Sequence, residues 1–238
     1  MKVAIHQPQY FPWPPYMHKV MSADIFVYLD TVQFSKNGLQ NRNQIKTANG
    51  PLWLTVPVKH KLGLSIAATE IADSRATEKH WNTLVANYSR TAGFERWRDE
   101  LRELLTRPRH SLADVAIAST EWILEKLNVN TKRMLASQIP DAQGHSSELI
   151  ASICKALGAT EYLSGTGALA YLDVSNFSAF GCQVLLQQWN PLTYDQKYEK
   201  AGFTSDLSTL DLLLNCPDQA AALIAGAGSW RLSLQDND

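Results

Sequence analysis

The chain has 238 residues, of which 45% are hydrophobic, and a formal net charge of −1 at pH 7. This size supports one substantial core, and the near-zero charge excludes a general attraction to nucleic acid or anionic lipid. No stretch approaches the roughly 18 apolar residues of a membrane span, and no secretory signal pattern is present, so we expect a cytoplasmic protein without a membrane span. Three cysteines without a Cys-x-x-Cys pair fit reduced, packed thiols.

The first thirty residues predict a strand, a helix and a second strand. An apolar strand at residues 3–5 enters a turn rich in proline and aromatic residues, and a helix begins near Pro15 with His18 in its first turn. A second strand over residues 25–29 ends at Asp30. This is the order of a βαβ unit, whose strand C-termini and helix N-termini are where α/β proteins place ligands.

A β-hairpin is expected next. Residues 44–47 and 53–58 flank Asn49-Gly50-Pro51, a tight-turn sequence. One more short strand is predicted over residues 66–71. From about 75 to 140 the apolar residues recur at helical spacing, which predicts an inserted α-helical subdomain, or cap.

The last third returns to alternating elements. Ser146 is a candidate N-cap for a helix, and strands are expected at residues 160–163 and 184–189. The predicted fold is therefore a single α/β domain over residues 1–238, with a Rossmann-like, mostly parallel sheet, the helical insertion and the hairpin. We expect the tail over residues 230–238 to fray.

Candidate catalytic residues lie at the first strand-to-helix corner. His6 follows the first strand, His18 lies near the helix start, and both are expected to point into one cleft with Asp30 nearby. Histidine suits proton transfer near neutral pH and, when protonated, can hold a phosphate. The alternative is that each histidine only hydrogen-bonds the backbone of the proline-rich turn. His6, His18 and Asp30 are also a conceivable three-ligand set, but no metal motif is present and we expect no metal.

Two loops are candidates for binding an anion. The loop from Asp30 to Lys46 carries Lys36 and Arg42 among several amide side chains, and such a loop can hold phosphate or carboxylate oxygens. The alternative is a solvated surface loop. Ser164-Gly165 follows a predicted strand and can present backbone amides to an anion.

Four stretches of the chain resemble the WbqC-like protein family of bacterial O-antigen and related surface-polysaccharide gene clusters. They are IHQPQYFPWPPYMHK, LDTVQFSKNGLQNRNQIKT, SSELIASICKALGATEYLSGTGALAYLD and LSTLDLLLN. The chain differs at Pro14-Pro15, where a Leu-Gly pair is expected, and at His145, where an arginine is common. The first corner also resembles, in part, that of nucleotidylyltransferases, whose H-x-G-H helix start holds ATP phosphates; here Pro15 and Met17 replace its first His and its Gly.

The resemblance implies a transferase that adds a glycyl or other amino-acyl group to the amino group of a sugar. The implied partners are a nucleotide-linked amino sugar and an amino acid or other acyl donor, with ATP or an acyl thioester as the source of activation. In this hypothesis His6, His18, Lys36 and Arg42 stabilise a pyrophosphate or an adenylated carboxylate while the sugar amine attacks the acyl carbon. The expected substrate-binding residues are Gln7, Tyr10, Trp13, Gln33, Lys36, Arg42, Asn43, Ser164, Gly165 and Tyr171.

Two alternatives remain open. The protein is either a catalyst or a non-catalytic binder of a sugar nucleotide or partner enzyme, in which the aromatic residues Tyr10, Phe11, Trp13 and Tyr16 form a stacking platform. A thioester-dependent acyltransferase differs from the ATP-dependent one in its donor alone. The sequence does not specify an oligomeric state.

Overall fold

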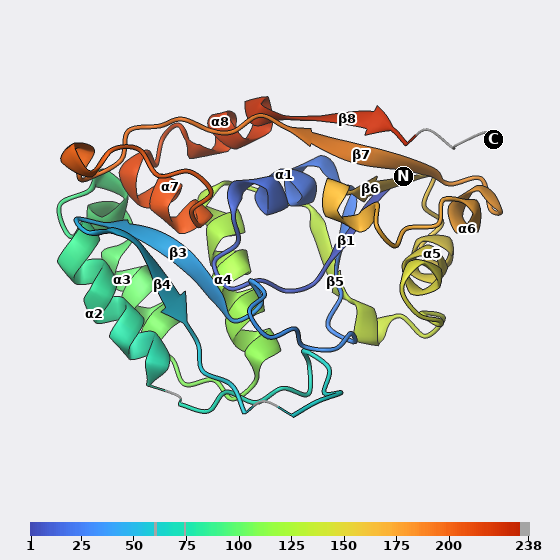
Figure 1. The fold of residues 1–238 in the computed structure, drawn as a ribbon, viewed down its shortest axis with the longest axis horizontal. Helices are drawn as coiled ribbons and strands as arrows, with labels where there is room; N and C mark the ends of the chain where they lie inside the picture. Colours follow the sequence, from blue (N-terminus) through green and yellow to red (C-terminus); the bar gives the residue numbers. More distant parts are fainter. Residues whose placement is uncertain (60, 74, 234–238) are drawn as a thin grey trace.

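A computed structural model describes residues 1–59, 61–73 and 75–233 and has a six-stranded sheet in the order β5-β2-β1-β6-β7-β8 (Figure 1). Its strands are β1 (Lys2–His6), β2 (Ile25–Tyr28), β5 (Lys132–Leu135), β6 (Glu161–Ser164), β7 (Gln183–Trp189) and β8 (Gly228–Leu232). All neighbouring pairs are parallel except β7 and β8. The expected α/β fold with a mostly parallel sheet is confirmed.

Both faces of the sheet are covered, as parallel strands require. Alternate residues of β1 point to opposite faces, so Ala4 belongs to one core, which includes α1 (Pro14–Ser22), while Val3 and Ile5 belong to another. The second core packs α5 (Ser147–Ala156) and the short α6 (Ser175–Ser178) against the sheet. The order is therefore helix, sheet, helix.

The helical insertion consists of α2 (Ala76–Tyr88), α3 (Ala92–Thr106) and α4 (Leu112–Lys126). Ser111 caps α4 by accepting a hydrogen bond from the Asp114 backbone N–H. The predicted hairpin is confirmed as β3 (Arg42–Thr47) and β4 (Gly50–Thr55), which lie over the insertion (Figure 1). Two helices, α7 (Thr209–Asn215) and α8 (Ala220–Ala227), close the first core.

Three expected boundaries differ from the structure. The stretch from 75 to 140 is not wholly helical, because β5 emerges from it and pairs with β2 at the sheet edge. The tail expected to fray from residue 230 begins as β8, which pairs with β7 as far as Leu232, while residues 234–238 lie outside the described residues. Residues 66–71 make isolated bridges instead of a strand. In the described residues, no helix combines the length and apolar character needed to cross a membrane.

The connections that follow β1 and β6 cover opposite faces of the sheet. After β1 the chain passes through α1 on one face and enters β2, whereas after β6 it passes through α6 on the other face and enters β7. Neighbouring strands whose connections diverge in this way open a crevice at their carboxyl ends, which is where open α/β sheets bind ligands.

Candidate active site

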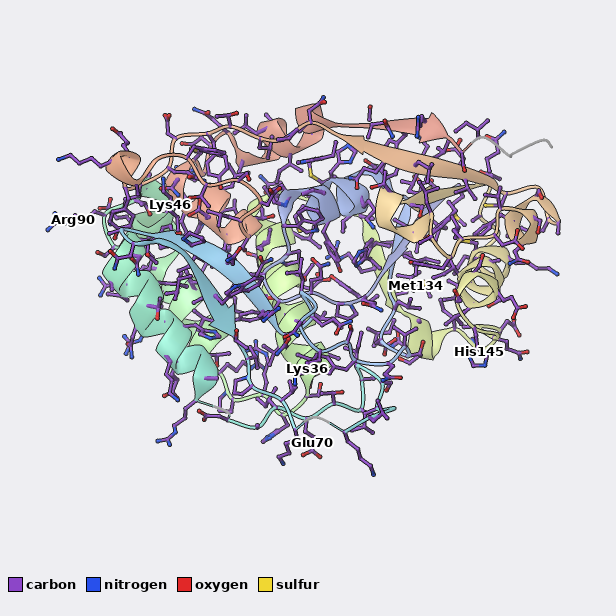
Figure 2. The ribbon with its side chains drawn as sticks, in the orientation of Figure 1. Lys36, Lys46, Glu70, Arg90, Met134 and His145 are labelled. Carbon is purple, nitrogen blue, oxygen red and sulfur yellow. The ribbon has the colours of Figure 1, made fainter. Side chains whose placement is uncertain are left out.

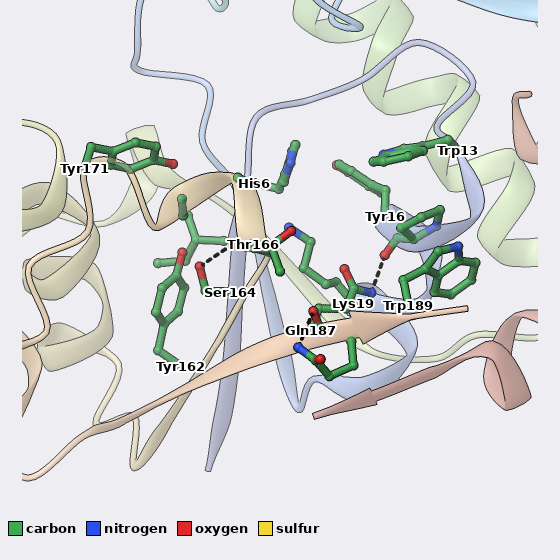
Figure 3. Close-up of a pocket in the computed structure, with 16 residues that line it drawn as sticks. His6, Trp13, Tyr16, Lys19, Tyr162, Ser164, Thr166, Tyr171, Gln187 and Trp189 are labelled. Atoms are coloured by element: carbon green, nitrogen blue, oxygen red, sulfur yellow. Dashed lines mark hydrogen bonds between the residues drawn. The ribbon is translucent and has the colours of Figure 1, made fainter. Parts of the chain in front are cut away.

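A cavity of about 750 Å³ lies at this point of divergence, between the carboxyl ends of β1, β6 and β7 and the first turns of α1. The side chains at its two ends are aromatic: Trp13 and Trp189 stand at one end and Tyr171 at the other, with Lys19 between them (Figure 3). Aromatic faces of this kind bind sugar rings and nucleobases by stacking.

Lys19 is a buried cation without a charged partner. Its side chain is only 5% exposed, and within the described part of the chain it makes no hydrogen bond and no ion pair. Burial lowers its pKa from 10.5 to about 7, so the side chain exists as a mixture of ammonium and neutral amine near pH 7. A lysine in this state either receives an anionic ligand or accepts a proton.

The position of Lys19 follows from how α1 begins. Pro14 and Pro15 occupy the first two helical positions, where a missing N–H costs nothing. Lys19 is three residues after Tyr16 and four after Pro15, so all three project from the same helix face, and this face lines the cavity.

A glycine-containing loop after β6 lies against the Lys19 side chain. A Cβ atom at Gly165 would be 3.5 Å from Lys19 Nζ, which places the amine directly against the loop backbone. Among the described residues, nothing accepts a hydrogen bond from the backbone N–H groups of Thr166 and Gly167. One amine and two free backbone donors bordering one cavity form a corner suited to an anion.

His6 is the last residue of β1 and lines the same cavity. Its Nδ1 is 3.0 Å from the Gln7 carbonyl oxygen, and its ring meets the Tyr16 ring edge to face with centroids 4.9 Å apart. Burial, and then the charge of Lys19, lower the His6 pKa to about 3. The ring is therefore neutral at pH 7, and because Nδ1 donates to the carbonyl, Nε2 is left as an acceptor.

The structure separates His18 and Asp30 from His6. His18 does not line the cavity; it projects from α1 toward β7 and β8, where Gln187 Nε2 is 2.9 Å from its Nδ1. Asp30 is buried and accepts hydrogen bonds from the backbone N–H and the hydroxyl of Ser137, at 3.0 and 2.7 Å. The two histidines do not face one cleft, and the described residues hold no group of three or more His, Cys, Asp or Glu side chains able to bind a metal.

The expected anion-binding loop lies away from the cavity. Lys36 is exposed, on the loops below α1 in Figure 2, and Gln33 is also exposed. Arg42 donates to the Asn37 carbonyl oxygen and stacks over Trp53, 4.4 Å from the ring centroid, while Asn43 donates to the Phe11 carbonyl oxygen. These contacts tie the loop to the hairpin and to the proline-rich turn.

The remaining expected residues divide between the cavity and the core. Trp13, Ser164, Gly165 and Tyr171 line the cavity, together with His6. Gln7 instead accepts a hydrogen bond from Gln40 Nε2. The aromatic platform is not assembled, because Tyr10 and Phe11 are each 1% exposed and pack in the core, whereas Tyr16, also 1% exposed, borders the cavity. Tyr10 directs its hydroxyl to His80 Nδ1, at 2.8 Å.

Sequence reasoning missed Lys19, Gln187 and Trp189. A signal for Lys19 was present, because a lysine at helical spacing from Pro15 and Tyr16 belongs to the buried face of α1. Gln187 and Trp189 are two residues apart in β7 and therefore point to the same face of the sheet, which they share with Leu185. Their shared face with Lys19 depends on the strand order, which the residues of β7 alone do not reveal.

The fold and the cavity define a three-layer α/β protein with a ligand-sized site at the switch point of its sheet. The chain belongs to the WbqC-like protein family, whose model matches residues 7–222. A curated relative from Mycobacterium tuberculosis, described as "Uncharacterized protein Rv1507c", is 33% identical over 222 residues, covering 92% of this chain and 95% of that protein. No solved structure matches the chain.

Proposed function

We propose that the protein transfers an acyl group, glycyl or another amino-acyl group, to the amine of a nucleotide-linked amino sugar during the synthesis of O-antigen or related surface-polysaccharide precursors. The observation that carries this proposal is Lys19, an uncompensated buried amine in a cavity at the switch point of the sheet. Keeping such a group buried costs stability, and this cost is typical of functional residues.

The chemistry requires a proton acceptor near neutral pH. A sugar amine attacks the activated acyl carbon with its lone pair; the new N–C bond forms, and the C–O bond of an acyl adenylate or the C–S bond of a thioester breaks. The attacking nitrogen must lose one proton, and neutral Lys19 takes it before releasing it to solvent. A lysine with a pKa of about 7 is matched to this role.

The surrounding groups support binding of both substrates. The free N–H groups of Thr166 and Gly167 are donors for a phosphate or for the oxygen that becomes negative as the acyl carbon is attacked. Trp13, Trp189 and Tyr171 offer faces for a base or sugar ring, and Nε2 of neutral His6 accepts a hydrogen bond from a substrate hydroxyl or amine.

A non-catalytic binder is the second candidate function. A lysine ammonium beside two free backbone donors also holds a phosphate without any reaction, and this observation favours the alternative. Such a protein would saturate with a sugar nucleotide and release it unchanged.

The test is mass spectrometry on a panel of nucleotide-linked amino sugars incubated with the purified protein. One set of mixtures contains glycine and ATP, and a parallel set contains acyl thioesters. A product heavier by one glycyl unit and formed only with ATP supports amino-acyl transfer, and a product formed only with a thioester supports the thioester-dependent enzyme. Binding without any mass change supports the binder and contradicts the transferase.

A further inference from the structure

Gln187 uses both of its amide hydrogens inside the protein. The side chain is 6% exposed, on the face of β7 that α1 covers, and it lines the cavity. Its Nε2 is 2.8 Å from the Pro15 carbonyl oxygen and 2.9 Å from His18 Nδ1. Because an amide nitrogen carries two hydrogens, both are committed, and the orientation of the amide is fixed.

His18 must then present a lone pair at Nδ1. An amide N–H donates to this atom only when its own proton is absent, so His18 is neutral and carries its proton on Nε2. The ring has no freedom to turn. It stacks on Trp230 with centroids 5.4 Å apart, meets the Trp189 edge at 5.8 Å, and would lie 2.3 Å from a Cβ atom on residue 228, which is glycine.

The carbonyl oxygen of Gln187 is the remaining polar atom of this side chain. No described residue donates a hydrogen bond to Oε1, and this atom is not among the buried, unpartnered polar atoms of the structure. It is therefore accessible from the cavity, in the same region as Lys19 (Figure 3). A fixed acceptor rejects a ligand group that cannot donate, because the acceptor loses its water and gains no partner.

We propose that His18 is a positioning residue, which holds the Gln187 amide so that Oε1 accepts a hydrogen bond from the amine of the sugar. This deepens the proposed function, on which it rests, by assigning the residue that recognises the amine. The sequence suggested a catalytic role for His18; in the structure it acts through Gln187, and Gly228 leaves the space for its ring.

The experiment measures binding in the absence of any acyl donor, so its outcome is separate from that of the transfer assay. The probes are UDP-glucosamine and UDP-2-deoxyglucose, which lacks the amine, and affinities are measured by calorimetry on the full chain. The wild-type protein should bind UDP-glucosamine at least about tenfold more tightly. Gln187→Met and His18→Leu should bring this ratio close to one, while His18→Asn, which keeps an acceptor near the Nδ1 position, should retain most of it.

The ratio of the two affinities is used because partial unfolding lowers the apparent affinity for both ligands equally and leaves their ratio unchanged. Thermal unfolding of each variant confirms that a folded protein is being compared. A wild-type ratio near one overturns the inference, and so does a ratio that survives in Gln187→Met and His18→Leu. Amine selectivity that depends on both residues, in a protein that shows no acyl transfer, would support this inference and reject the transferase.

Discussion

The Nζ atom of Lys19 lies 3.5 Å from the point where a Cβ atom would stand on Gly165. The amine therefore rests against a loop backbone instead of beside a carboxylate, and the described residues offer it no ion pair. An unpaired cation buried in this way destabilises the folded protein, and such a cost is explained when the site binds an anionic ligand.

Replacing Lys19 by methionine should stabilise the protein and abolish acyl transfer. The Lys19 pKa is 10.5 in the unfolded chain and about 7 in the folded one. Because the unfolded chain binds the proton first, the wild type becomes less stable as the pH falls from 10.5 to 7. At pH 7 the variant avoids this cost and should gain on the order of 1–4 kcal/mol. Urea unfolding at pH 7 and pH 10 measures the gain, which should shrink at the higher pH.

Lys36→Met is the matched control, because Lys36 is exposed and does not line the cavity. It should change stability by less than about 0.5 kcal/mol and leave transfer intact. A Lys19→Met protein that is less stable than the wild type, or that keeps full transfer activity, would contradict the role given to Lys19.

Replacing Gly228 by alanine should destabilise the protein through a clash with His18. The added Cβ would lie 2.3 Å from the His18 ring, and forcing such a contact costs about 1–3 kcal/mol. Gly226→Ala is the control: this residue lies in helix α8, a Cβ there meets nothing within 4 Å, and the change should stabilise by about 0.5–1 kcal/mol. In the His18→Ala background the cost of Gly228→Ala should largely vanish; an equal cost in both backgrounds would refute the contact.

His80 should make the protein sensitive to acid. Its Nδ1 bonds to the Tyr10 hydroxyl and its Nε2 to the Thr55 carbonyl oxygen, and burial lowers its pKa from 6.5 to about 4. The unfolded chain binds a proton first, so stability is lost as the pH falls from 6.5 toward 4. At pH 5 the loss attributable to His80 should be about 2 kcal/mol. The test is to measure the free energy of unfolding of the wild type and of His80→Gln at pH 7.5 and at pH 5. An equal loss of stability in the two proteins between these pH values would exclude His80 as the source.

Asp30→Asn should weaken the fold without weakening ligand binding. Asp30 accepts two hydrogen bonds from Ser137, which join the end of β2 to the turn after β5. In Asp30→Asn an amide NH₂ group, itself a donor, would face one of the two Ser137 donors. The expected cost is about 1–3 kcal/mol. Since Asp30 does not line the cavity, the affinity for UDP-glucosamine should stay within about twofold of the wild type. A selective loss of affinity with unchanged stability would favour the catalytic role that the sequence suggested.

Local signals predicted most of the fold. The strand, proline-led helix and strand of the first βαβ unit and the Asn49-Gly50 turn each depend on neighbouring residues, and the structure contains them. The helix expected after Ser146 is α5, although the Ser146 side chain makes no capping hydrogen bond. The strands β5 and β8 were not predicted. They form the two edges of the sheet, and most of their residues are at least partly exposed, so neither strand has the apolar pattern of a buried one. Their pairing is decided by distant partners, Ile25 onward for β5 and Leu185 onward for β8.

The site was predictable only in part. His6 ends a strand, Trp13 directly precedes a helix and Gly165 directly follows a strand, and these positions alone suggested the cavity. Lys36 and Arg42 are cations of a polar loop that follows a predicted strand, but the hairpin carries that loop away from the sheet edge. The cation that does line the cavity, Lys19, is placed by the rotation of α1 over β1 and β7, which is a tertiary property.

The most direct test of this account is the reactivity of Lys19 itself. Brief treatment with trace acetic anhydride between pH 6 and pH 11, followed by peptide mass spectrometry, reports the fraction of each lysine that is a free amine. Lys19 should reach half of its maximal reactivity near pH 7, and UDP-glucosamine should protect it from labelling. Half-maximal reactivity near pH 10.5, or labelling that is unchanged by the sugar nucleotide, would contradict the claim that this amine is the functional group of the cavity.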